Sequence, residues 1–420
     1  MNAATSEGLR FAAGLALAAA AYPLRHLGRR ADPVRHWWLT PLVDVATAGA
    51  VAGILLGATA PRRVAESLDQ LVALALVFLA GWLGLTAGCS MDLRVLRRHR
   101  GTHMAVEALQ SAATLALVSL AAWAGSRLFE VETGLVTAAG LFLVAGLCTA
   151  GPPLPRPRTP RKAAGTRPGF WRPSASAVLG IALVGIGVSF VRAEPFALRL
   201  PWAAEVTPLL LEGATTRLWW ALVLGGLAGL LCDLGTREEF ALGGLYYLLA
   251  GTVLLAGGLA AALGMEPLLV GCVAGIWLIN ATLRRVDVVH VLGRGAAVPR
   301  LGVPVLAGWM LARTFPGAGA GDWLAFGVVL LALLGVRTAV RVRGARVGGG
   351  GTPQAARAAE AGGLAGLLVV GELPLVIAAG ASRVVAAPTA WAVLAAAVAS
   401  QLILGAAAAL VRHRSAPPLP

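Results

Sequence analysis

The chain has 420 residues, of which 58% are hydrophobic and 13% are charged, and its formal net charge is +15 at pH 7. Soluble domains are about 45–50% apolar and about 25% charged, so this composition excludes an ordinary soluble protein and favours one embedded in a bilayer. The four cysteines show no CxxC spacing and suggest neither a disulfide framework nor a metal site.

Apolar stretches recur along the whole chain between clusters of Arg and Pro. A helix of about twenty apolar residues spans the hydrocarbon core of a bilayer, which is about 30 Å thick. The sequence therefore predicts an all-α polytopic membrane protein with about 13 transmembrane helices. The thirteen windows are 8–24, 40–60, 68–90, 102–125, 134–152, 174–191, 215–232, 239–263, 267–281, 298–314, 322–340, 360–381 and 386–410.

The basic residues support this count and predict an orientation. When basic residues at a window end are counted with the adjoining connection, the connections after odd-numbered windows hold 25 of the 35 Lys and Arg residues. The N-terminus and the other connections hold 9, and Arg337 lies deeper inside the eleventh window. Because Lys and Arg accumulate on the cytoplasmic side, we expect a multi-pass plasma-membrane protein with its N-terminus outside and its C-terminus in the cytoplasm. Orientation signals that face anionic lipid explain the net charge without a nucleic-acid partner.

The segments outside the windows are short. Residues 1–24 have no basic stretch before their apolar run, so a cleavable signal peptide is not expected. Residues 153–173 are rich in Pro and Arg and are predicted to form a cytoplasmic linker. We expect residues 1–420 to form a single transmembrane domain without a soluble regulatory domain and without a cofactor.

The fifth window, 134–152, ends in a run of residues that interrupt helices. Thr149, Gly151 and Pro152 follow an ordinary apolar stretch. One interpretation is a helix that simply ends at Pro152 before the linker. The other is an interrupted helix at a transporter's midplane site, because paired Gly/Pro-interrupted segments in two halves indicate such sites in inverted-repeat transporters.

The twelfth window, 360–381, contains both a carboxylate and a proline. Glu372 is central in this window, too far from either end for its side chain to reach water, so it is a candidate functional residue. Pro374 removes a backbone donor and, with Gly371 beside the carboxylate, predicts a break or kink there. The fifth and twelfth windows are seven apart, which gives them opposite orientations, as inverted repeats require.

Other charged residues are less informative. Arg337 either belongs to the same site as Glu372 or extends to the cytoplasmic surface. The six histidines lie in loops or at helix ends, and His99 and His103 have helical i, i+4 spacing but no third ligand nearby, so neither a metal site nor an enzyme is expected. The remaining candidates lie near window ends and are interpreted as interfacial: Asp44, Glu107, Asp233, Glu266, Asp322 and Arg383.

Four stretches, in order, resemble the monovalent cation:proton antiporter superfamily, which includes sodium/hydrogen exchangers and Kef-like transporters. They are AGILLGATAP (52–61), LALVFLAGWLGLTAGCSMDLRVLRRH (74–99), LGMEPLLVGCVAGIWLIN (263–280) and GGLAGLLVVGELPLVIAAG (362–380). The resemblance implies inverted repeats with two interrupted crossing helices. The fourth to sixth and eleventh to thirteenth helices would form a mobile core, and the others a dimerising scaffold.

The resemblance also implies roles for individual residues. Thr149, Gly151 and Pro152 match the family's first crossing motif, and Gly371 and Pro374 would mark the second crossing. Arg337 matches a basic residue on the preceding core helix, and Glu372 matches the acidic position of the family's Gly-Glu pair. The ion- and proton-binding residues would then be Glu372, Arg337 and Thr149.

The sixth window, 174–191, departs from the family pattern. Exchangers carry an aspartate there that binds the cation, whereas residues 177–188 contain no ionisable side chain. Three hypotheses therefore stay open. The chain is a Na⁺ or K⁺:proton antiporter in which Glu372 has taken over the coupling, a transporter of another small solute or anion on the same scaffold, or an inactive or regulatory homologue.

Small residues in two windows also bear on assembly. Gly and Ala let helices approach closely, as in AGAVAGILLG (48–57) and GGLAGL (225–230). With the resemblance, they predict a homodimer.

Overall fold

The structure is a computed structural model, and its described residues are almost entirely helical. Four helical stretches are long and apolar enough to cross a membrane: Val64–Cys89, Ala214–Thr236, Leu242–Ala262 and Arg285–Thr314. The described residues are 45–94, 112, 175–190, 213–238, 241–314, 326–327, 329–330, 333–334, 372–381, 392–400 and 403.

Of the helices with bounds among the described residues, eight overlap predicted windows and one lies in a predicted connection. The helix α13 (Arg285–Gly295) occupies the connection between the ninth and tenth windows, where no helix was expected. The other helices are α3 (Val45–Thr59), α4 (Arg62–Cys89), α8 (Ala175–Phe190), α10 (Ala214–Thr236), α11 (Leu242–Ala262), α12 (Pro267–Ala281), α14 (Ala297–Thr314) and α17 (Glu372–Ala381).

Local chemistry explains the sharp boundary between α11 and α12. Gly264 adopts a positive φ of 70° after the end of α11, a conformation that costs glycine little. Pro267 then occupies the first turn of α12, and the Glu266 side chain accepts a hydrogen bond from the Leu268 N–H at 3.4 Å. A proline needs no hydrogen-bond acceptor at a helix start, so α12 begins where the sequence predicts.

The most extensive contacts between described helices are those of two pairs, α3 with α14 and α4 with α12. In the first pair, a Cβ atom added to Gly53 would collide with the Val305 carbonyl oxygen, and one added to Gly308 would collide with the Ala50 carbonyl oxygen. Such contact between backbones is available only to glycine. It is the small-residue packing by which helices associate in membranes.

The second pair, α4 with α12, repeats this contact. A Cβ atom on Gly271 would collide with the Gly81 carbonyl oxygen, and one on Gly84 would collide with the Leu268 carbonyl oxygen. Leu268 and Gly271 correspond to residues 50 and 53 of α3 by a constant shift of 218 residues. Gly81 and Gly84 correspond to residues 305 and 308 of α14 by a shift of 224 residues. The two pairs are therefore equivalent at individual contacts.

The two equivalent pairs run in opposite directions. Within the first pair the helices are parallel, because Gly49 lies against Pro304 and Gly57 lies against Ala312. Helices α4 and α14 are antiparallel, because Gly302 lies against Leu79, whereas Asp69, nearer the start of α4, bonds to residues nearer the end of α14. The Trp309 indole N–H donates a hydrogen bond to the Asp69 carboxylate at 2.7 Å. The Arg313 guanidinium lies 3.4 Å from the same carboxylate.

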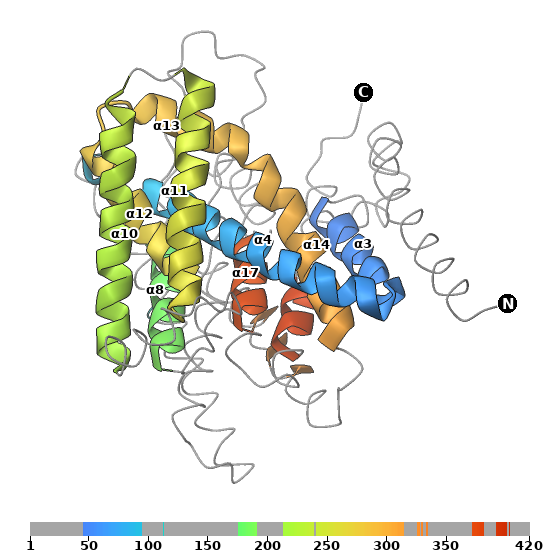
Figure 1. The fold of residues 1–420 in the computed structure, drawn as a ribbon. Coiled ribbons are helices and arrows are strands. Elements are labelled where there is room, and N and C mark those ends of the chain that lie inside the picture. The colour runs from blue at the N-terminus through green and yellow to red at the C-terminus, as the bar shows by residue number, and fades with distance from the viewer. Residues whose placement is uncertain are drawn as a thin grey trace, which may run out of the picture.

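The parallel order also holds in the second pair, where Gly84 lies against Leu268 and Gly88 lies against Cys272. Helix α3 is thus antiparallel to its equivalent α12. Figure 1 shows the two pairs along the length of α4, with α10, α11 and α12 toward one end and α3 and α14 toward the other. Buried residues of all these helices belong to one contiguous hydrophobic cluster.

The small residues that suggested a dimer face are used inside the chain. Gly53 packs on α14, as described above, and a Cβ on Gly225 or Gly229 of α10 would lie 2.7 Å from the Cβ atoms of Val273 and Trp277 on α12. These glycines therefore bring helices of the same chain together. The homodimer stays a prediction that rests on the family resemblance.

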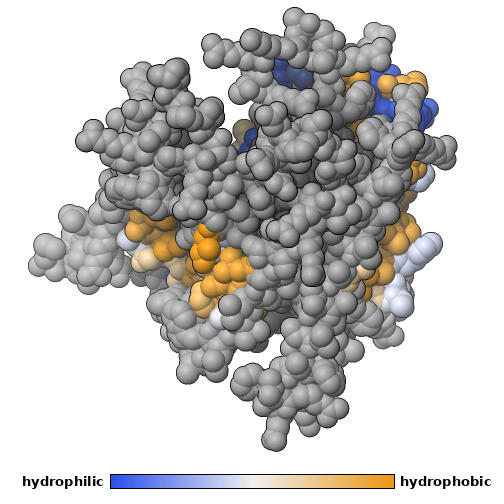
Figure 2. Space-filling view, turned by 180° about the vertical axis from the view of Figure 1, so that it is seen from behind, coloured by the Kyte–Doolittle hydropathy of each residue, from blue (hydrophilic) through white to orange (hydrophobic). Residues whose placement is uncertain are grey.

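The outer surface carries large apolar side chains. Trp219 is 64% exposed, Tyr247 76% and Leu255 66%. In Figure 2 the apolar surface of the described residues lies at mid-height, and strongly hydrophilic residues gather toward the upper end. An apolar belt with a polar end is the surface that a bilayer accommodates.

Candidate functional site

The sequence-predicted site falls on α17 and on segments beyond the described residues. Glu372 is the first residue of α17, and Pro374 is its third residue and is buried. The other predicted residues lie outside the described part of the chain and stay predictions: Thr149, Gly151, Pro152, Arg337 and Gly371.

Helix α17 is enclosed by protein rather than lipid. It contacts α14, α4 and α8, and its residues 374–379 are all buried. The acidic residue therefore stands at the N-terminal end of a described helix that other helices cover.

Helix α8, the sixth predicted window, lies beside this enclosed helix. It contacts α17, α12 and α10, and a Cβ on its Gly185 would lie 3.1 Å from the Leu269 Cγ atom. The Ser189 hydroxyl donates to the Gly185 carbonyl at 2.7 Å and so is satisfied within the helix. Since residues 177–188 include no ionisable side chain, this stretch of α8 supplies no carboxylate to its contact with α17.

The structure identifies Glu266 as a carboxylate close to α17. A Cβ added to Gly380 would lie 3.9 Å from both carboxylate oxygens of Glu266, so the start of α12 meets the C-terminal part of α17. From the sequence, Glu266 was interpreted only as an interfacial residue at a helix end. Its place directly before Pro267 indicates a helix cap, but its proximity to residue 380 depends on tertiary packing.

Side-chain hydrogen bonds connect the C-terminal end of α12 to the residues that follow α4. Asn280 Oδ1 accepts from the Leu93 N–H at 2.9 Å, and Asn280 Nδ2 donates to the Met91 carbonyl at 3.1 Å. Arg285 approaches the Asp92 carboxylate at 4.0 Å. The hydroxyls of Thr236 and Thr282 lie 2.9 Å apart and link α10 to the same end. Polar links at this end add to the close glycine packing and hold the α4–α12 pair together.

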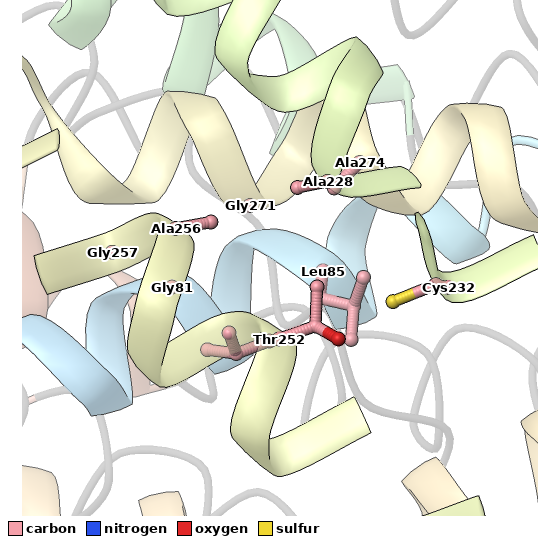
Figure 3. Close-up of a pocket in the computed structure, with 10 residues that line it drawn as sticks. Gly81, Leu85, Ala228, Cys232, Thr252, Ala256, Gly257, Gly271 and Ala274 are labelled. Carbon is pink, nitrogen blue, oxygen red and sulfur yellow. The ribbon is translucent and has the colours of Figure 1, made fainter. Parts of the chain in front are cut away.

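A small cavity lies among α4, α10, α11 and α12. Its volume is about 10 Å³, and mostly small apolar residues line it, with the Cys232 thiol and the Thr252 hydroxyl as polar groups. Figure 3 shows the lining residues, with Gly81, Ala256 and Gly257 toward the left and Cys232 toward the right. This volume holds at most a single water molecule, so the cavity is a packing defect rather than a solute site.

Within the described residues no group of three His, Cys, Asp or Glu side chains is placed to hold a metal ion. No protein-family model and no curated protein matches this chain. Its function must therefore be inferred from the residues and their packing.

Proposed function

We propose that this protein is a secondary active transporter that exchanges a monovalent cation, Na⁺ or K⁺, for protons by alternating access. The observation that carries the proposal is the equivalence of the α3–α14 and α12–α4 pairs in opposite directions. Inverted repeats of this kind build many secondary transporters, in which one bundle moves against the other around a midplane site.

The packing suggests which parts stay rigid. Backbone contacts through Gly53 and Gly308 join α3 to α14, and those through Gly84 and Gly271 join α4 to α12. Such contacts cannot slide without a clash, and Asp69 links the two pairs through Trp309 and Arg313. Helices α8 and α17 lie against this framework through side chains, as at Gly185 and Leu269. The proposed scaffold is therefore the four glycine-packed helices, and the proposed moving core contains α8 and α17.

The proposed coupling residue is Glu372, at the start of α17, with Arg337 setting its charge balance and Thr149 adding an oxygen ligand. The two interruptions, at Gly151 and Pro152 and at Gly371 and Pro374, would free carbonyl oxygens near the site. Carbonyl and carboxylate oxygens suit a hard monovalent cation. We further propose that the protein works as a homodimer in the plasma membrane.

A second candidate is a transporter of another small solute or an anion. It is favoured by α8, which contacts α17 yet lacks the aspartate that the resemblance leads one to expect. In that case Arg337 would supply the dominant charge of the core. An inactive or regulatory homologue is the third alternative.

Ion selectivity separates these candidates. The protein is expressed in a strain without its main sodium/proton antiporters, and everted vesicles are energised to build a proton gradient. Sodium, potassium and lithium are then added in turn while a pH-sensitive dye is recorded. We expect dequenching by at least one cation, and no response to any of them would overturn the antiporter proposal.

The proposed topology can be tested by labelling single cysteines in a variant without the four native ones. Leu283 is 93% exposed between α12 and α14, and Ser67 is exposed near the start of α4. In intact cells we expect an impermeant maleimide to label cysteines at Ser67 and Ala318 from outside. Cysteines at Leu283, Ala164 and Gly348 should react only after lysis. Labelling of positions 67 and 283 from the same side would contradict this orientation.

A further inference from the structure

The unpredicted helix α13 joins two helices of the scaffold, α12 and α14. Figure 1 shows it lying across the end of the bundle near α11, whereas α14 descends through the structure. In the proposed topology this end faces the cytoplasm. A helix that lies across the end of a membrane bundle is placed at the height of the lipid headgroups.

Helix α13 has two different faces. Val288, Val291 and Leu292 are buried against the bundle. Val286, on the other side, is 60% exposed, and Leu283, which precedes the helix, is 93% exposed. His290 and Arg294 continue the same exposed stripe at intervals of four residues. The stripe therefore begins with the apolar side chains of Leu283 and Val286 and ends with the polar side chains of His290 and Arg294.

The charges near α13 have different surroundings. Arg284 pairs with Asp287 at 3.0 Å, and Arg285 approaches Asp92 at 4.0 Å, so these two arginines meet acidic side chains of the chain itself. Arg294 is exposed, and no acidic side chain of the described residues pairs with it. Figure 2 shows hydrophilic and hydrophobic surface side by side at the upper right, the end at which α13 lies.

The equivalent surface in the other repeat has a different charge. The shift of 224 residues that relates α4 to α14, continued along the sequence into α13, pairs His290 with Glu66 and Arg294 with Gln70, and both residues of α4 are exposed. Neither of these two α4 positions carries a basic residue. In the proposed topology, Glu66 at the start of α4 lies at the outer surface, and Arg294 of α13 lies at the cytoplasmic surface.

We propose that α13 is an interfacial helix that binds anionic phospholipid in the cytoplasmic leaflet. Leu283 and Val286 enter the boundary between headgroups and acyl chains, and Arg294 contacts lipid phosphates. The cytoplasmic leaflet carries the negative surface potential that attracts basic residues beside membrane helices. This inference rests on the proposed orientation in the membrane but not on the ion that is transported.

The affinity of purified protein for lipid tests the role of Arg294. The thermal unfolding midpoint in mild detergent is followed while phosphatidylglycerol or phosphatidylcholine is added. We expect phosphatidylglycerol to stabilise the protein at lower concentration than phosphatidylcholine. Arg294→Gln should weaken the phosphatidylglycerol response about fivefold, the effect of one arginine near an anionic surface.

The matched control is Arg237→Gln, since Arg237 is also exposed but its guanidinium bonds to Asp233 at 3.0 Å. It should leave the lipid response unchanged. An equal response to the two lipids, or equal effects of the two variants, would overturn the proposal. In a second measurement, a nitroxide at Val286→Cys in phosphatidylglycerol nanodiscs should be more accessible to oxygen than to a water-soluble nickel relaxant. Greater accessibility to the nickel relaxant than to oxygen would also overturn the proposal. Neither measurement depends on ion flux.

Discussion

Replacing Glu372 with glutamine is expected to abolish cation-dependent proton flux while the protein still folds. Glutamine keeps the shape of the side chain but can neither carry the charge nor exchange the proton, and both are required of a coupling residue. The measurement is dequenching in everted vesicles, with size-exclusion chromatography to establish that the variant is produced and monodisperse.

Two other carboxylates serve as controls for this variant. Glu66 is exposed at the start of α4, so Glu66→Gln should transport normally. Glu266 lies beside Gly380 of α17, and Glu266→Gln should keep its flux if Glu372 alone couples the proton. Normal transport by Glu372→Gln together with loss of flux in Glu266→Gln would place the coupling at the start of α12 instead.

Adding one methyl group at the two equivalent glycine contacts should destabilise the protein. Alanine at Gly84 would press its Cβ against the Leu268 carbonyl and place it 2.9 Å from the Cys272 nitrogen. Alanine at Gly308 would meet the Ala50 carbonyl and the Ile54 nitrogen in the same way. Since backbone atoms cannot rotate away, the helices must separate, at a cost of about 1–3 kcal/mol for each variant.

The control for these variants is Gly226→Ala. Nothing lies within 4 Å of a Cβ at Gly226 of α10, so this change should be neutral or stabilise by up to about 1 kcal/mol through helix propensity. Unfolding can be followed with a thiol-reactive dye, because Cys89, Cys232 and Cys272 are buried and free. The same unfolding midpoint for Gly84→Ala, Gly308→Ala and Gly226→Ala would contradict close backbone packing. Clearly different midpoints for Gly84→Ala and Gly308→Ala would contradict the equivalence of the two pairs.

Composition and the lengths of apolar runs sufficed to predict helical structure and apolar helices of membrane-spanning length. Both follow from local chemistry, because a backbone in hydrocarbon must satisfy its hydrogen bonds within one helix. The boundary at Glu266 and Pro267 is likewise local, since a proline after a capping carboxylate starts a helix wherever it occurs. These features need no information about distant residues.

The partners of each helix could not be predicted in this way. Lipid-facing and protein-facing surfaces of membrane helices are both apolar, so hydrophobic periodicity does not distinguish them. Gly53 and Gly225 were therefore read as part of a dimer face, although they pack on α14 and α12. Helix α13 was missed because its eleven residues are too short and too charged for a spanning window.

The candidate site was likewise predicted from the sequence only in part. Glu372 and Pro374 were recognised because a carboxylate and a proline are unusual inside an apolar run, whatever surrounds them. That Pro374 is buried in a helix covered by α4, α8 and α14, and that Glu266 lies beside residue 380 of that helix, was decided only by the tertiary structure. Both depend on contacts between segments far apart in the chain, which composition and spacing along the chain do not encode.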